Sequence, residues 1–308
     1  MSLPEIKESQ LPPPSPTARY TLVQAIAEVS LGSVIHAIHL PLGGHFLSLN
    51  QALILTFASR SAADRREAMS TVTGVGTSAA ILKALSPAGK RLTPMLAIGV
   101  QSVLFALGIG ALGRHVLGAV LGGVLLSIWG FAQPLLLGYL LFGNVLFEAA
   151  LKIWTDTALA LGISTELGLR FLLGLVIAKA AIAGVLTAAA WLSGERLEKA
   201  YLRRVKKLAG QTKPLPSRKV RRTAISGALR DLLNPWFVAS VILTILFFVM
   251  SGPDGATHAV WFTLRTLAWA LLFFWAIRAV PRRWIHLGLK KFPRVAAGVQ
   301  YALGELKR

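Results

Sequence analysis

The chain has 308 residues, of which 54% are hydrophobic and only 15% are charged, and its mean hydropathy is +0.61. Soluble globular proteins carry about 25% charged residues, so this composition excludes an ordinary soluble domain and predicts an all-α, polytopic helical membrane protein. The net charge of +20 does not indicate a nucleic-acid-binding protein, because most Lys and Arg residues lie between or after apolar segments, as membrane topology requires.

The predicted elements begin with a tail over residues 1–19, which is rich in proline and mixed in charge. We expect this tail to be disordered and to contain no signal peptide. A six-span membrane core follows over residues 20–192, since its apolar runs approach the length of about 20 residues that a helix needs to cross the hydrocarbon layer. The predicted spans cover residues 20–40, 46–59, 94–112, 116–130, 132–151 and 166–192.

Residues 68–85 are rich in Gly, Ser, Thr and Ala, and we predict that they do not cross the membrane. If this segment stays on one side, the basic residues of 60–66 and 83–91 share that side with the basic residues after 195, in agreement with the positive-inside rule. We therefore expect a re-entrant or interfacial segment that is buried against protein. Both termini are then cytoplasmic, and the outer face carries residues 39–46, Arg114 and 155–165.

After the core, residues 193–232 are predicted to form a basic cytoplasmic helix followed by a linker. Glu195 and Lys199 have the i,i+4 spacing of a stabilising helical ion pair. A Pro-Leu-Pro sequence at 214–216 then ends the helix.

Two further apolar runs, at 235–250 and 259–280, predict a two-span membrane hairpin over residues 233–280. The last segment, 281–308, is a basic cytoplasmic tail with interleaved aromatic residues. This pattern is typical of an amphipathic helix on anionic lipid, and a surface for a protein partner is the alternative.

The polar segment 36–51 interrupts the predicted core and carries three of the six histidines, His36, His39 and His45. Pro-Leu-Gly-Gly at 41–44 predicts a turn. His36 and His39 share a helix face, and the turn can bring His45 back toward them. Imidazoles in this arrangement suit Ni, Co, Cu or Zn, while contacts to an organic solute and a structural role remain open.

Other polar side chains extend this candidate site. Asn50 and Gln51 each donate and accept hydrogen bonds, so they can contact an amide or carboxylate of a solute, or satisfy the irregular backbone nearby. Glu28 is costly in lipid and should face the bundle interior, with Lys179 as its candidate partner. The candidate substrate-binding residues are His36, His39, His45, Asn50, Gln51, Gln101, Asn144 and Glu148.

Catalytic signatures are absent from the sequence, which contains no Gly-x-Ser-x-Gly, no His-Glu-x-x-His and no phosphate-binding Gly-rich loop ending in Lys-Ser/Thr. The 13 acidic residues and the lack of cysteine leave few candidates for acid–base, two-metal or thiolate chemistry. We therefore expect a protein that is not an enzyme and uses no cofactor.

Two stretches resemble a known family. They are Pro-Leu-Gly-Gly-His-Phe-Leu-Ser-Leu-Asn-Gln at 41–51 and Leu-Lys-Ala-Leu-Ser-Pro-Ala-Gly-Lys-Arg-Leu-Thr-Pro-Met-Leu-Ala-Ile at 82–98, the second followed by Gln101 and Phe105. With them, residues 20–192 resemble the substrate-binding membrane subunit (S component) of energy-coupling-factor transporters. The resemblance implies uptake of a vitamin-like micronutrient or a transition-metal ion, with a transmembrane coupling subunit and two cytoplasmic ATPases as partners.

The resemblance also implies a solute site near the outer face, under residues 36–51 and 162–170. We therefore expect the substrate-binding subunit of an ATP-driven importer in a bacterial cytoplasmic (inner) membrane. Two alternatives stay open. One is a membrane-embedded enzyme that acts on a lipid-like substrate with histidine as its acid–base group. The other is a membrane scaffold that binds a partner through its basic cytoplasmic segments.

Overall fold

The protein is described by a computed structural model that covers residues 15–37, 43–85, 92–211, 224–233, 235–250, 255–279 and 292–306. Within these ranges the regular structure is entirely α-helical, which confirms the predicted all-α class. The chain divides into two compact units. Unit 1 comprises Met1–Ala132, Leu172–Ser217 and Leu289–Arg308, and unit 2 comprises Gln133–Phe171 and Arg218–Gly288.

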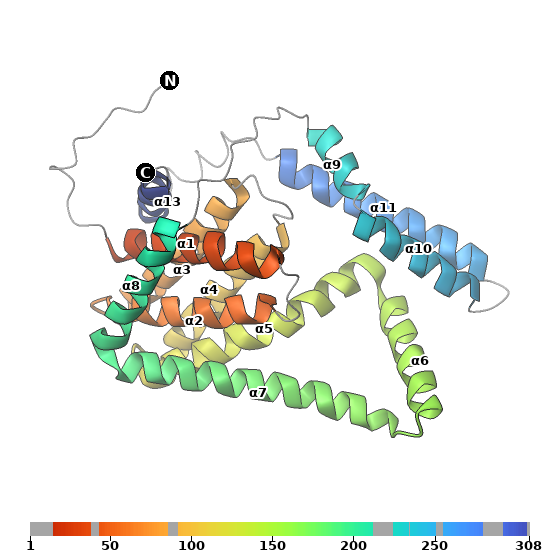
Figure 1. The fold of residues 1–308 in the computed structure, drawn as a ribbon, viewed down its shortest axis with the longest axis horizontal. Coiled ribbons are helices and arrows are strands. Elements are labelled where there is room, and N and C mark those ends of the chain that lie inside the picture. Colours follow the sequence, from red (N-terminus) through yellow and green to blue (C-terminus); the bar gives the residue numbers. More distant parts are fainter. Residues whose placement is uncertain are drawn as a thin grey trace. The chain divides into compact units, whose positions relative to one another are not determined.

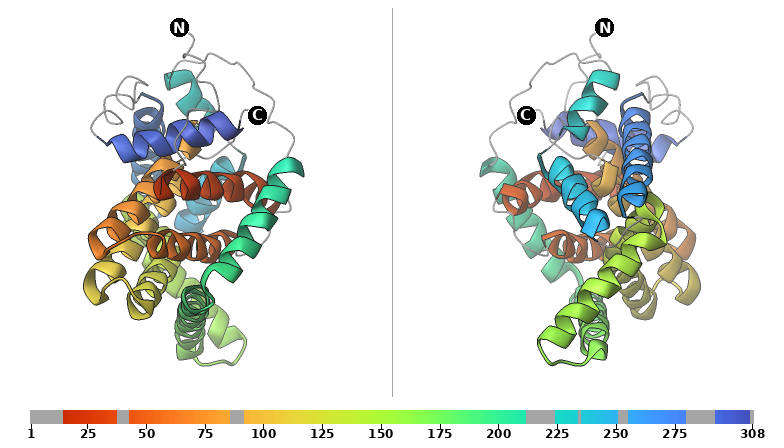
Figure 2. Two further views of the ribbon diagram at one scale, coloured as in Figure 1. Left: turned by 90° about the vertical axis from the view of Figure 1, so that its left-hand side faces the viewer. Right: turned by 90° about the vertical axis from the view of Figure 1, so that its right-hand side faces the viewer.

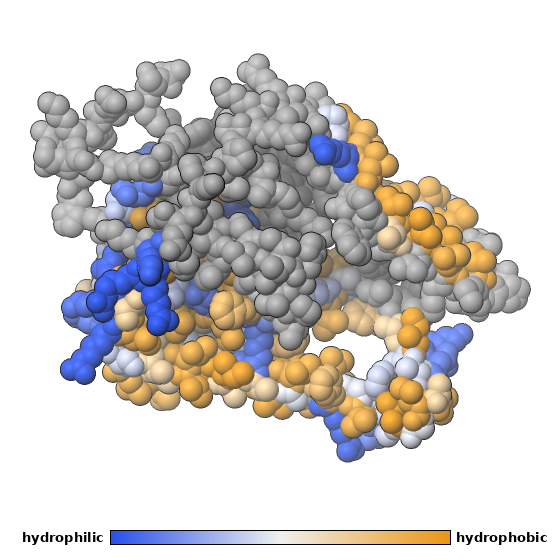
Figure 3. Space-filling view, viewed as in Figure 1, coloured by the Kyte–Doolittle hydropathy of each residue, from blue (hydrophilic) through white to orange (hydrophobic). Residues whose placement is uncertain are grey.

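Three helical segments of the described chain are apolar and long enough to cross a membrane, as expected for a polytopic membrane protein. They are Pro94–Leu112, Val116–Leu140 and Thr165–Leu192. Figure 3 shows hydrophobic surface along the last of these segments. The described residues therefore agree with a helical membrane protein but do not confirm the predicted six-plus-two spans.

Unit 1 is a helical bundle around an apolar core (Figures 1 and 2). Its main helices are α1 (Pro16–Ala37), α2 (Gly43–Arg60), α3 (Arg65–Leu85), α4 (Leu92–Leu112), the first part of α5 (Val116–Phe142) and the last part of α7 (Thr165–Leu192). Large side chains from several of these helices are almost fully buried in the core, among them Tyr20, Phe57, Phe105 and Leu126.

Helices α3 and α4 pack antiparallel at very short range. Gly76 of α3 lies against Ser102 of α4, while Met69, near the start of α3, contacts Gly110, near the end of α4. Small side chains permit this close approach. Residues 68–85 therefore belong to one continuous helix beside α4. Most of them are buried or half-buried against protein, as the sequence predicted.

The ends of these helices meet in space. Nη1 of Arg114 donates a hydrogen bond to the backbone carbonyl oxygen of Arg60 at 3.3 Å. The predicted topology placed Arg60 and Arg114 on opposite sides of the membrane, because residues 68–85 were not counted as a span. Arg60, Arg65, Arg66 and Arg114 instead share one end of unit 1, which we call the basic end.

Helix α5 also differs from prediction. The expected spans 116–130 and 132–151 are not separated at residue 131, since α5 continues through Pro134 to Phe142. The chain breaks at Gly143, whose φ of +68° is a conformation that glycine adopts without strain. Helix α6 (Asn144–Ala160) begins directly after it.

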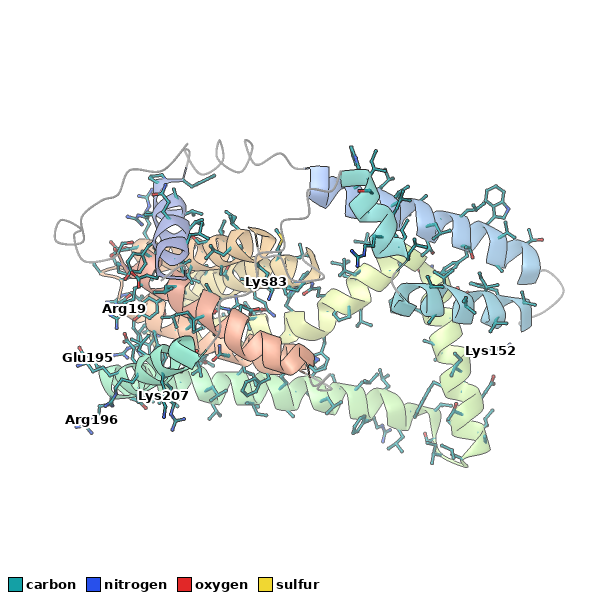
Figure 4. The ribbon with its side chains drawn as sticks, turned by 45° about the horizontal axis from the view of Figure 1, so that its top comes forward. Arg19, Lys83, Lys152, Glu195, Arg196 and Lys207 are labelled. Atoms are coloured by element: carbon teal, nitrogen blue, oxygen red, sulfur yellow. The ribbon has the colours of Figure 1, made fainter. Side chains whose placement is uncertain are left out.

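Helix α8 (Gly194–Gln211) is amphipathic, and its apolar side packs on the bundle through Tyr201 and Val205. The hydroxyl of Tyr20 on α1 donates to Glu198 of α8 at 2.6 Å. The opposite side is exposed and charged, and Figure 4 labels Glu195, Arg196 and Lys207 on it. The predicted ion pair is confirmed, with Nζ of Lys199 lying 2.6 Å from Glu195.

The C-terminal helix α13 (Pro293–Leu306) belongs to unit 1 and packs on α1 and α3. Its Val299 and Ala302 are buried in a small apolar cluster with Ala25 and Leu82. The apolar face of α13 is therefore covered by protein in the described part of the tail, rather than facing lipid as the sequence predicted.

Unit 2 contains α6, the start of α7, α9 (Ala224–Leu232), α10 (Pro235–Met250) and α11 (Gly255–Ala279). Helices α10 and α11 lie side by side and antiparallel, and the rings of Phe248 and Phe262 are 5.0 Å apart between centroids. The predicted C-terminal hairpin is thus present as a helical pair. Its Ala259–Leu272 segment is apolar but shorter than the three candidate spans.

Candidate solute-binding site

Three helices of unit 1 bring a cationic, an imidazole and an aromatic side chain together. Lys179 comes from the middle of α7, His45 from the first turn of α2 and Phe131 from α5. Each lies about 14 residues, or about 20 Å at 1.5 Å per residue, from the basic end. The group therefore lies at the opposite end of the bundle, which we call the site end.

The ammonium group of Lys179 is buried, with only 7% of the residue exposed. Its Nζ donates to the backbone carbonyl oxygen of Ser127 at 3.0 Å and lies 5.1 Å from the centroid of the Phe131 ring. No carboxylate pairs with Lys179 among the described residues. Buried lysines are rare unless paired, so this cation is the most unusual feature of the bundle.

The predicted Glu28–Lys179 pair is wrong. Glu28 instead lies 3.4 Å from Nζ of Lys83 on α3, and it accepts a hydrogen bond from Gln24 at 3.5 Å. Because α1 packs against α3 along its length, Lys83 is the nearer cation, and Lys179 is left without a protein counter-charge in the described part of the chain.

His45 completes the group. Its ring stacks at a tilt on Phe131, with centroids 4.5 Å apart, and its Nδ1 is buried without a hydrogen-bond partner in the described structure. The imidazole therefore has one nitrogen that is available to a ligand.

Gly130 explains how the two nitrogen groups approach each other. A Cβ atom at Gly130 would meet both Nζ of Lys179 and Nδ1 of His45. The two nitrogens therefore lie within a few ångströms of one point on α5, close enough to contact one small ligand. The Ser127 hydroxyl is also buried without a partner in the described structure.

Two predicted site residues make hydrogen bonds between helices. Oδ1 of Asn50 accepts a hydrogen bond from the Tyr201 hydroxyl at 2.7 Å, and Nε2 of Gln51 donates to the carbonyl oxygen of Ile98 at 2.9 Å. Both side chains are buried and join α2 to α8 and α4. Gln101 is likewise buried, on α4.

The remaining predicted residues are not brought to this group by the described structure. Asn144 and Glu148 are exposed on α6 of unit 2, and residues 162–170 also belong to unit 2. His36 belongs to α1, but its side chain lies outside the described part of the structure, as does all of His39. Within the described residues no group of three His, Asp or Glu side chains could hold a metal ion, so a histidine metal site remains a prediction.

Sequence reasoning missed Phe131, Ser127 and Gly130, and it gave Lys179 the wrong partner. A usable signal was present, because a lysine in the middle of a strongly apolar helix indicates a functional site by default. The aromatic and glycine residues carried no such signal, since both are common in membrane helices.

Comparisons of the chain with protein-family models, with curated proteins and with solved structures find no match. The function therefore has to be inferred from the chemistry of the site and from the arrangement of the helices around it.

Proposed function

We propose that the protein is a membrane-embedded subunit that binds a small solute for an ATP-driven importer. The supporting observation is the buried ammonium group of Lys179, which has no carboxylate partner in the described structure and lies beside the unpaired Nδ1 of His45. A buried charge without a counter-charge is costly. A solute that supplies the missing negative charge removes this cost, so the burial of Lys179 favours binding of such a solute.

The direction of transport is inferred from the charge distribution. Arg60, Arg65, Arg66 and Arg114 mark the basic end, and Lys and Arg residues favour the cytoplasmic side of a membrane. The site end then faces outward, where an importer receives its solute. The stretch 41–51, which resembles the first loop of S components, includes the first turns of α2 at this end.

The remaining features of the proposal follow from this orientation. Helices α1 to α5 and α7 of unit 1 cross a bacterial cytoplasmic membrane, and α10 and α11 form an additional hairpin. The sequence contains no phosphate-binding loop, so energy comes from separate ATPases through a transmembrane coupling subunit. The exposed basic side of α8, which begins at the basic end, lies near anionic headgroups.

A mass-spectrometric measurement with metal analysis tests the proposal on detergent-solubilised protein. We expect a stoichiometric solute in the wild type and in the Lys152→Met control, whose exposed lysine lies on α6, and its loss in Lys179→Met. Membrane vesicles that contain the chain should then take up this solute only when ATP is supplied. Uptake that needs no ATP, or chemical turnover of the solute by the isolated chain, contradicts the proposal.

A further inference from the structure

We infer that the ligand of the Lys179 site is an organic monoanion, namely a carboxylate on a flat or apolar body. The inference rests on the proposed function, since it assigns a substrate class to the same site. The carboxylate is held by Lys179 and His45, and the body of the ligand packs beside Phe131.

The charge of the ligand follows from the groups that surround the site. Lys179 supplies one positive charge, and its ammonium has three N–H donors, of which the Ser127 carbonyl oxygen accepts one. His45 presents Nδ1 without a partner in the described structure, and in the Nδ1–H tautomer this nitrogen donates a hydrogen bond to a carboxylate oxygen. One negative charge balances this set, so a monocarboxylate fits better than a phosphate dianion or a dicarboxylate.

The shape of the ligand follows from the aromatic ring that lies close to both nitrogen groups. Phe131 lies under the ammonium of Lys179 and against the ring of His45. Such a ring favours contact with a flat or apolar group over contact with a hydrated one. Gly130 contributes by having no side chain, because a Cβ atom there would lie 2.5 Å from Nζ of Lys179 and 3.3 Å from Nδ1 of His45.

The same geometry disfavours a transition-metal ion at His45. A divalent cation bound to Nδ1 would lie within a few ångströms of the Lys179 ammonium, where like charges repel strongly because water is excluded. Of the two cargo classes that the sequence left open, the structure thus favours the organic micronutrient.

Binding to the full-length protein in lipid nanodiscs tests the inference. The probes are two pairs that differ only in charge, benzoate with benzamide and indole-3-acetate with indole-3-acetamide, together with inorganic phosphate and NiCl2. We expect at least one carboxylate to bind tenfold or more tightly than its amide. Equal affinity within both pairs, or tighter binding of phosphate or Ni²⁺, overturns the inference.

Variants tie this preference to the site. Lys179→Met should weaken carboxylate binding at least tenfold. Lys179→Arg keeps the charge, so its loss of affinity on a logarithmic scale should be less than half of the loss in Lys179→Met. Lys152→Met should bind as the wild type does. If Lys179→Met does not fold, Gly130→Ala provides the second test, because it displaces the ammonium without removing it and should also weaken binding. Unchanged carboxylate affinity in the folded variant overturns the inference.

Two further outcomes distinguish possible failures. Nanodiscs with and without phosphatidylglycerol show whether an anionic lipid takes the site, since competition by that lipid points to a headgroup rather than a soluble carboxylate and overturns the assignment. A carboxylate that binds but is not taken up with ATP contradicts the importer proposal alone. A neutral solute that is taken up supports the importer and contradicts the anion assignment.

Discussion

Arg114 donates a hydrogen bond to the backbone carbonyl oxygen of Arg60, although 54 positions separate them and a simple hydropathy argument puts them on opposite faces of the membrane. Their contact requires that α3 and α4 together run away from the basic end and return to it.

Cysteine labelling in intact cells checks this arrangement, because the natural chain contains no cysteine. We expect single cysteines at the exposed positions Ala63 and His115 to react with an impermeant maleimide from the same side, and one at the exposed Gly44 to react from the other side. Labelling of positions 63 and 115 from opposite sides would restore the non-crossing interpretation of residues 68–85.

The Glu28–Lys83 pair should contribute to stability because both side chains are largely buried. We expect Glu28→Gln to lower the free energy of unfolding by about 1–3 kcal/mol, since Lys83 then loses its partner. The exposed pair Glu195–Lys199 is the matched control, and Glu195→Gln should cause no measurable change. Denaturant titration in detergent measures both, and equal effects of the two substitutions would show that Glu28 has no structural role.

Replacing each of two glycines on α4 by alanine should change the stability of the protein differently. A Cβ atom at Gly108 would overlap the backbone of Gly122 on α5, whereas a Cβ atom at Gly99 meets nothing within 4 Å. We expect Gly108→Ala to destabilise the bundle by about 1–3 kcal/mol through overpacking. Gly99→Ala should be neutral or stabilise by up to about 1 kcal/mol, because alanine is the better helix former.

Thermal unfolding of the two alanine variants, each compared with the wild type in the same detergent, decides this prediction. A Gly108→Ala protein that melts at or above the wild-type temperature would show that α4 and α5 are not in close contact.

Composition and run length predicted the helical class, the α10–α11 pair and the ion pair on α8, because each depends on residues that are close in sequence. The break at residue 131 was wrong for a similar reason. Gly130 and Pro134 have the local signature of a helix end, but α5 continues through both residues to Phe142.

The candidate site was predicted less well than the fold. His45 was among the candidates because it lies in a conspicuous polar segment, whereas its neighbours Phe131 and Lys179 come from α5 and α7, far along the chain. Asn50 and Gln51 looked like ligand contacts because buried amides need partners, and the structure shows that the Tyr201 hydroxyl and the Ile98 carbonyl group meet that need. Which partner satisfies a polar group is decided by helix packing, which a single sequence does not specify.

The hydrogen bond between Asn50 and Tyr201 links the site to the outside of the bundle. His45 and Asn50 are separated by little more than one turn of α2, about 8 Å along a rigid helix. Asn50 and Tyr201 therefore join the group around His45 to α8, whose opposite side is exposed and charged.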